Sequence, residues 1–233
     1  MSLFTPVNLV CPGCKTAILM DAVGSVNADR RPDYRDDILN DHFQDVTCVN
    51  CNETFRLQPR FNYLDAGRRQ WIAAFPSARL LDWVVAEAEV AELFTTSYGK
   101  DAPQAAQDVG VDLDVRMTFG WPAVREKILA REHDLDDGVL ELLKLDLIRG
   151  VDSAPVSTGV EVRLVGAGDD VLTLVWLDGP TEKPLQEIHV PIEHYKAIAD
   201  NLEPWQKIYT QLTDSVFVDI QKLYMGEGRN AAE

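Results

Sequence analysis

The sequence predicts an α+β protein in which a small β module at the N-terminus precedes a larger, acidic region of helices and strands. Three observations lead to this class. All four cysteines lie in two Cys-x-x-Cys pairs within the first 51 residues. Apolar residues recur at helical spacing in the middle of the chain, and apolar and polar residues alternate in the last third. With 233 residues, the chain can hold one large domain or two small ones.

The two cysteine pairs are the most specific signal in the chain. They consist of Cys11 with Cys14 and Cys48 with Cys51. Two such pairs facing each other give the closed four-thiolate shell in which proteins hold structural zinc. The spacing therefore predicts one structural zinc ion per chain with these four ligands. It also predicts a zinc-ribbon-like β module with a helical insertion between the pairs.

Other uses of the cysteines stay open. A four-cysteine iron site has pairs of the same spacing, and Cys-x-x-Cys pairs also serve redox chemistry. A redox pair of the thioredoxin type needs a βαβ pattern, which neither pair has around it. Two disulfides would suit a small secreted protein, whereas residues 1–10 have no basic start and no apolar h-region. We therefore expect reduced thiols and a cytoplasmic location.

Charge limits the classes of partner. The formal net charge is −16, and almost all of the excess lies after residue 75. Such a chain is repelled by phosphate backbones unless a local patch overrides the field. No apolar run approaches the roughly 20 residues that cross a bilayer. We expect no membrane partner and no general affinity for nucleic acid.

The first part of the chain is expected to form the ribbon module, residues 1–95. Strands are expected to lead into and out of each cysteine pair, and a polar helix to begin behind Pro32. An amphipathic helix is expected after Pro76. The expected strands cover residues 7–10, 16–27, 43–47, 54–57 and 71–75, and the expected helices residues 33–40 and 78–94.

Residues 96–112 contain Gly99, Pro103 and Gly110 and are predicted to form a linker. An acidic α+β domain is expected to follow over residues 113–233. Its expected strands are residues 115–119, 160–165, 171–177 and 185–190, and its expected helices residues 122–131, 136–149, 192–202 and 204–212. The type of the closing element, residues 216–224, is left open, and residues 226–233 are expected to be a polar tail.

Acidic and histidine residues in this region could form a second site, for a metal or for acid–base chemistry. Asp134, Asp136 and Asp137 lie near His133, but acids at these positions are typical of a helix start. His189 and His194 are five residues apart across Pro191 and lack the spacing of a helical zinc motif. We expect no catalytic residues and no enzyme activity.

The order of features resembles the CpXC domain of bacterial and archaeal proteins. The matching segments are Cys11-Pro12-Gly13-Cys14, Val26-Asn27-Ala28-Asp29, Cys48-Val49-Asn50-Cys51, Pro59-Arg60-Phe61-Asn62-Tyr63-Leu64-Asp65 and Ile72-Ala73-Ala74-Phe75-Pro76. The resemblance covers residues 5–95 and extends more weakly through residues 116–150. It implies a fold and a metal site, and it implies no biochemical activity.

The second cysteine pair departs from the family pattern at two positions. Val49 stands where the family usually has proline, and Asn52 stands where it usually has glycine. Proline at the first position mainly presets φ, so valine costs little there. Asparagine can enter the left-handed region that the turn requires. We therefore expect the metal site to survive both departures.

Residues 55–71 interleave arginines and aromatic residues. The arginines are Arg56, Arg60, Arg68 and Arg69, and the aromatic residues are Phe55, Phe61, Tyr63 and Trp71. Single-stranded nucleic acid is often held by such a combination. Alternatively, the aromatic side chains fill the core of the module and the arginines pair with acidic residues, which we favour because four arginines are few beside the acidic remainder.

The sequence thus predicts a zinc-binding, non-enzymatic protein that acts as a protein–protein interaction or adaptor module. Its partner is expected to be another protein or a second copy of itself. Tryptophans are enriched at binding hot spots, so exposure of Trp83 or Trp121 would favour a protein partner. The alternatives are a nucleic-acid-associated or transcription-related protein that uses residues 55–71, and a redox-responsive Cys-x-x-Cys protein.

Overall fold

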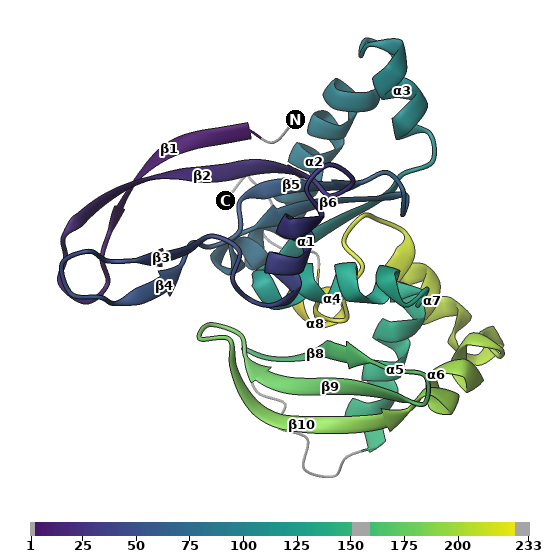
Figure 1. Cartoon of the computed structure of the whole chain (residues 1–233). Helices are drawn as coiled ribbons and strands as arrows, with labels where there is room; N and C mark the ends of the chain where they lie inside the picture. Colours follow the sequence, from purple (N-terminus) through teal and green to yellow (C-terminus); the bar gives the residue numbers. More distant parts are fainter. Residues whose placement is uncertain (1–2, 151–158, 227–233) are drawn as a thin grey trace.

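The structure is a computed structural model that describes residues 3–150 and 159–226 (Figure 1). That part of the chain contains both helices and strands, and the strands form three β-sheets. The predicted mixed α+β class is confirmed. The sheets have five, three and two strands. No helix of the described residues is long and apolar enough to cross a membrane.

The five-stranded sheet has the order β1-β2-β5-β6-β7. Its strands are β1 (Leu3–Val10), β2 (Ala17–Asn27), β5 (Phe61–Asp65), β6 (Gln70–Phe75) and β7 (Asp114–Phe119). Pairs β1–β2 and β5–β6 are antiparallel hairpins, whereas β2–β5 and β6–β7 are parallel. Strand β5 was not predicted from the sequence, in which residues 59–65 carry only the family resemblance.

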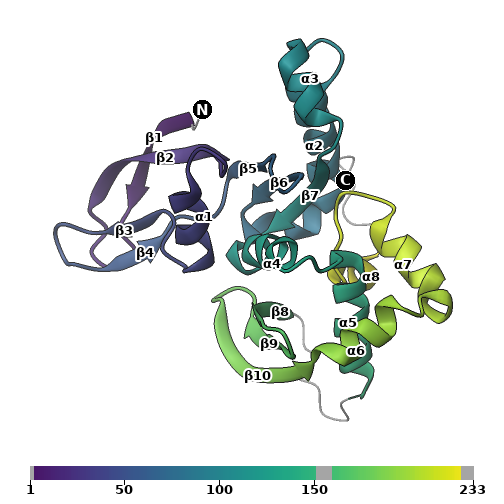
Figure 2. The same cartoon turned by 45° about the vertical axis from the view of Figure 1, so that its right-hand side comes forward.

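The second cysteine pair lies on a separate, two-stranded hairpin. It consists of β3 (Asp45–Thr47) and β4 (Thr54–Arg56). Figures 1 and 2 show this hairpin beside the projecting part of the β1–β2 hairpin, with the turns of both at the far end. We call this projection, residues 3–22 and 45–56, the arm. Helix α1 (Pro32–Leu39) begins at Pro32, as expected, and forms the insertion between the two hairpins.

Helices cover both faces of the five-stranded sheet. Successive side chains of a strand point to opposite faces, and β6 is buried on both of them. Trp71 and Ala73 pack with α2 (Trp83–Tyr98), whereas Ile72 and Ala74 pack with α1 and with α4 (Trp121–Glu132). A 3₁₀ helix (Ser77–Asp82) leads into α2. Strand β6 is therefore the centre of the N-terminal core.

The segment predicted as a linker is largely helical. Helix α2 continues to Tyr98, and α3 (Gln104–Gly110) follows. Gly99 and Pro103 cap these two helices instead of marking an extended segment. Because β6 and β7 are parallel, their connection has to cross the sheet, and helices usually form such crossovers. The boundary expected between residues 95 and 113 thus falls between two strands of one sheet.

The C-terminal part contains a three-stranded antiparallel sheet of order β10-β9-β8. Its strands are β8 (Val160–Ala167), β9 (Val171–Asp178) and β10 (Lys183–Pro191), as the alternating pattern predicted. Helix α4 packs against β8, and α5 (Asp137–Gly150), α6 (Ile192–Ala199) and α7 (Gln206–Thr213) complete the helical layer, with a 3₁₀ turn (Glu203–Trp205) before α7. Together they enclose a second core around Leu142, Leu174 and Trp176.

The closing element returns to the first sheet. The backbone N–H of Met117 on β7 donates to the carbonyl of Val216 at 2.9 Å, and Phe217 is buried beside Trp83 and Phe119. The short helix α8 (Gln221–Met225) ends the described chain. Most of the predicted polar tail, residues 227–233, lies outside the described residues. This return covers the otherwise open edge of β7.

Candidate metal centre

The four cysteines come together at the tip of the arm. One Sγ atom from each lies within 4.8 Å of every other. The Sγ atoms of Cys11 and Cys51 are 3.5 Å apart, and those of Cys14 and Cys48 are 3.6 Å apart. Both close contacts therefore join the first pair to the second. No other group of three or more potential metal ligands occurs among the described residues.

The two cysteine turns have the same backbone hydrogen bonds. The N–H of Cys11 donates to the carbonyl of Thr16 at 2.9 Å, and the N–H of Cys48 donates to that of Glu53 at 2.8 Å. Four residues after the first cysteine of each pair, a backbone N–H donates to the carbonyl of that cysteine. The distances are 3.0 Å from Lys15 to Cys11 and 2.9 Å from Asn52 to Cys48. Two unrelated segments thus present their thiols in the same way.

The residue that closes each turn has a left-handed backbone. Lys15 has a φ of 62° and Asn52 a φ of 58°. The expectation that Asn52 would enter this region is confirmed. The matching position in the first turn was missed, because lysine gives no such signal. A left-handed non-glycine residue is disfavoured, so both turns need a constraint that holds them.

The positions of the sulfurs fit a tetrahedral metal. Zinc–thiolate bonds of about 2.3 Å imply sulfur–sulfur edges of about 3.8 Å in a regular tetrahedron. The distances of 3.5 and 3.6 Å are close to this value. They are far longer than the roughly 2.05 Å of a disulfide bond, and all four cysteines are free. The cluster is thus compatible with one bound metal ion.

Two of the thiols differ in acidity. Hydrogen bonds from Asn50 and Thr16 lower the pKa of Cys14 to about 5. For Cys51, a backbone hydrogen bond at Glu53 acts to lower the pKa, but the neighbouring Cys14 and partial burial outweigh it and raise the pKa to about 12. Metal ligation requires thiolates, so a bound metal ion would displace any proton that these cysteines still hold.

One side of the cluster faces solvent. Cys11 and Cys48 are buried, whereas Cys51 is exposed. Val49, in the second turn, has 93% of its surface exposed. The exposed apolar side chains on the arm are Leu3, Phe4, Val10, Leu19 and Val49. Leu3 and Phe4 lie at the opposite end of β1 from the cysteines, so Val10, Leu19 and Val49 form the exposed apolar surface near the cluster.

These features define a protein with a cluster of four cysteines that could bind a metal ion, at the tip of a projecting β arm. Comparison with known families matches residues 9–144 to the family described as CpXC protein. The match covers more than half of the chain, and the chain belongs to the CpXC family. Searches of curated proteins and of solved structures found no match.

His189 and His194 belong to no group of potential metal ligands among the described residues. His189 pairs with Glu187, and His194 pairs with Asp146 at 2.8 Å. Of the acids near His133, Asp136 caps α5 by accepting the N–H of Val139 at 2.9 Å. These contacts agree with the expectation of capping acids.

Asp137 lies in the first turn of α5, but it also takes part in a buried ion pair. Its carboxylate is 2.7 Å from the guanidinium of Arg116 and 2.9 Å from the ammonium group of Lys127. Lys127 and its neighbours Glu126, Glu141, Lys144, Arg163 and Asp219 are all nearly inaccessible to solvent. Sequence reasoning missed this cluster, because its members are scattered over two helices, a strand and a loop.

Residues 55–71 divide into core and surface. Phe61, Tyr63 and Trp71 are buried in the N-terminal core. Arg56 pairs with Asp41 and Glu182, and Arg68 pairs with Asp65 and Glu132. Arg60 and Arg69 are exposed. The arrangement favoured above, with aromatic residues in the core and arginines paired with acids, thus holds for three of the four aromatic residues and two of the four arginines, since Phe55 is only partly buried.

The two tryptophans that could have formed a binding surface do not do so. Trp83 and Trp121 have 8% and 1% of their surface exposed. The indole N–H of Trp121 donates to the carbonyl of Leu57 at 2.8 Å. Both side chains are core residues, and the exposed apolar surface lies on the arm instead.

Proposed function

We propose that Cys11, Cys14, Cys48 and Cys51 hold one structural zinc ion and that the arm folded around it is zinc-ribbon-like. The observation that carries this proposal is the convergence of four Sγ atoms from two turns with the same hydrogen bonds. Four thiolates complete the usual shell of structural zinc and leave no open position for a substrate. The proposed role of the metal is therefore structural, and the proposed protein is not an enzyme.

The arm needs such support because it lacks a core of its own. Strands β3 and β4 have only three residues each, and a two-stranded hairpin is marginally stable in water. Among the described residues, no apolar side chain of the arm belongs to the three hydrophobic clusters of the fold. Metal binding would then supply the folding free energy that packing does not.

We further propose that the protein acts by binding another protein or a second copy of itself through the arm, in the cytoplasm. Val10 and Leu19 have 62% and 71% of their surface exposed. Val10 pairs with Ala17 and Leu19 with Asn8, so both side chains stand on the same face of the hairpin as diagonal neighbours. Exposed, contiguous apolar groups of this kind favour a protein partner. Nucleic acid is less favoured, because Arg56 and Arg68 are already paired with carboxylates.

The interaction is tested with surface variants that leave the cysteines intact. We compare the wild type, the double variant Val10→Ser and Leu19→Ser, and the control Val111→Ser, whose valine is 81% exposed at the C-terminal end of α3. Each is cross-linked in cell extract, and bound chains are identified by mass spectrometry; self-association is measured by sedimentation velocity. We expect loss of the captured chain, or of the dimer, in the double variant only. Equal behaviour of all three proteins would move the interface away from the arm.

A further inference from the structure

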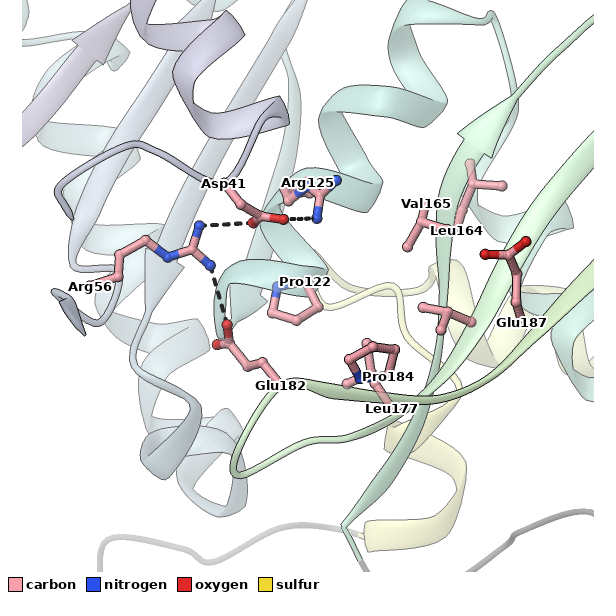
Figure 3. Close-up of a pocket in the computed structure, with 11 residues that line it drawn as sticks. Asp41, Arg56, Pro122, Arg125, Leu164, Val165, Leu177, Glu182, Pro184 and Glu187 are labelled. Atoms are coloured by element: carbon pink, nitrogen blue, oxygen red, sulfur yellow. Dashed lines mark hydrogen bonds and ion pairs between the residues drawn. The ribbon is translucent and has the colours of Figure 1, made fainter. Parts of the chain in front are cut away.

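A cavity lies between the base of the arm, helix α4 and the C-terminal sheet. Its volume is about 360 Å³. Aliphatic and proline side chains from α4 and the sheet form most of its wall, among them Pro122, Leu164, Val165, Leu177 and Pro184. Charged side chains close one side of it (Figure 3).

Those charged side chains form a chain of ion pairs centred on Arg56. Its guanidinium is 2.8 Å from the carboxylate of Asp41 and 3.2 Å from that of Glu182. Asp41 also pairs with Arg125 of α4. Figure 3 shows the contacts that link Arg125 to Asp41, Asp41 to Arg56 and Arg56 to Glu182 beside the cavity. We call Asp41, Arg56, Arg125 and Glu182 the Arg56 bridge.

The bridge joins segments that are far apart in the sequence. Glu182 lies in the turn between β9 and β10, and Arg56 ends β4. The Arg56 guanidinium also lies 4.6 Å from the centre of the Trp121 ring, a cation–π contact. The only other hydrogen bond that holds the Glu182 carboxylate among the described residues is a long one, from the N–H of Trp121 at 3.4 Å. Arg56 is therefore the main contact between the arm and the β9–β10 turn.

Both acidic partners of Arg56 have a disfavoured backbone. Asp41 has a φ of 61° and Glu182 a φ of 55°. Residues other than glycine leave the left-handed region unless their surroundings hold them there. Loss of Arg56 would remove the main partner of the Glu182 carboxylate and free that turn, whereas Asp41 would keep its ion pair with Arg125.

Arg56 is in turn tied to the cysteine cluster. It lies five residues after Cys51 on a hairpin whose strands pair only with each other. Asp41 lies four residues before that hairpin begins. A hairpin of two three-residue strands depends on what fixes its ends. At one end these are the cysteines, and at the other end they are the members of the Arg56 bridge together with the indole N–H of Trp121, which donates to the carbonyl of Leu57.

We propose that the Arg56 bridge is a latch that stays closed while metal occupies the cysteine cluster. Loss of the metal frees the β3–β4 hairpin, Arg56 then releases Glu182, and the β9–β10 turn moves away from α4 and opens the cavity. The proposal rests on the metal site of the proposed function. It makes the C-terminal sheet responsive to metal occupancy at the tip of the arm.

Hydrogen exchange measured by mass spectrometry tests the latch in the full chain. Zinc-loaded wild type is compared with the same protein after chelation, and the readout is exchange in residues 179–187. We expect chelation to speed exchange there about fivefold, the effect of losing a strong ion pair of this kind. The variant Arg56→Gln should exchange fast with zinc bound and should not respond further to chelation. The control Arg60→Gln, an exposed arginine without an ion pair among the described residues, should behave as the wild type.

Exchange in buried strand β6 reports whether the fold survives. If β6 stays protected and the cysteine turns respond to chelation, an unchanged β9–β10 turn overturns the latch and leaves the metal site standing. A zinc-loaded Arg56→Gln variant with wild-type exchange at the β9–β10 turn also overturns the latch, whatever chelation does. If the protein binds no metal, the latch and the proposed function both fail.

Discussion

Lys15 and Asn52 occupy equivalent positions in the two cysteine turns and have nearly the same left-handed φ, 62° and 58°. Each donates its backbone N–H to the first cysteine of its own pair. The two turns therefore have one shape, although they share no residue type at this closing position. The shape, more than the residue at this position, sets the direction of the thiols.

The first prediction concerns this closing position. A non-glycine residue in the left-handed region costs about 1–2 kcal/mol and a β-branched one is the least tolerated, so Lys15→Val should bind metal more weakly than the wild type and at least about tenfold more weakly than Lys15→Gly. Lys15→Gly removes the same side chain without backbone strain and should bind metal at least as well as the wild type. Competition with a chelator of known affinity measures both. Equal affinities of the two variants would show that the turn shape does not govern binding.

The second prediction concerns the buried ion cluster. The Glu126 carboxylate accepts hydrogen bonds from Lys144 at 2.6 Å, Arg163 at 3.1 Å and the backbone N–H of Leu164 at 2.6 Å. Glu126→Gln leaves buried cations without their partner and should lower the free energy of unfolding by about 3–5 kcal/mol. The half-exposed Glu132, which pairs with Arg68, is the control, and Glu132→Gln should cost less than about 1 kcal/mol. Chemical denaturation measures both; similar losses would contradict the assignment of the cluster as a core element.

The third prediction follows from Asp137. Burial acts to raise its pKa, but Lys127 and Arg116 outweigh burial and hold the pKa well below the usual value of 3.8. A carboxyl group with a lowered pKa in the folded state stabilises the protein above its unfolded pKa, and this stabilisation is lost as the pH falls through the folded pKa. The free energy of unfolding should therefore fall below about pH 4, by up to 1.4 kcal/mol per pH unit for this group.

Denaturation curves for the wild type and Asp137→Asn, recorded between neutral pH and about pH 3, measure this contribution. The variant should be less stable at neutral pH and should lose less stability on acidification. An unchanged pH profile would show that Asp137 does not contribute.

The fourth prediction concerns nucleic acid. Of the arginines in residues 55–71, Arg60 and Arg69 are exposed, and the rest of the chain is strongly acidic. Binding of a labelled single-stranded oligonucleotide should be weak and should disappear as salt rises from about 50 to about 200 mM. Fluorescence anisotropy measures this. An affinity tighter than about 1 μM at physiological salt would instead favour the nucleic-acid alternative.

Local patterns predicted most of the regular elements. Alternation in residues 160–190 and the position of Pro32 led directly to the C-terminal strands and to the start of α1. Helix α3 was missed because Gly99, Pro103 and Gly110 were interpreted as a linker, whereas in the fold they lie at helix ends. Glycine and proline occur both at helix ends and in extended loops. The sequence does not show that β6 and β7 pair in parallel, and it is this pairing that requires a crossover connection between them.

The cysteines could be predicted as a site because ligand spacing is local and specific. The buried ion cluster could not, because charged residues in a sequence usually indicate solvent exposure. Lys144 and Glu126 are 18 residues apart on different helices, and only the packing of α4 against α5 brings them together. The Arg56 bridge has the same origin, since Arg56 and Glu182 are 126 positions apart in the sequence.

The metal content of the purified protein tests the central claim most directly. Elemental analysis and native mass spectrometry of the wild type should give one zinc ion per chain, as the four thiolate ligands imply. Cys48→Ser should lose the metal, while Thr47→Ser, a change in the same hairpin that keeps all four ligands, should retain it. A wild-type protein that carries no zinc or other metal, and whose cysteines react with a thiol reagent in the native state, would contradict the account.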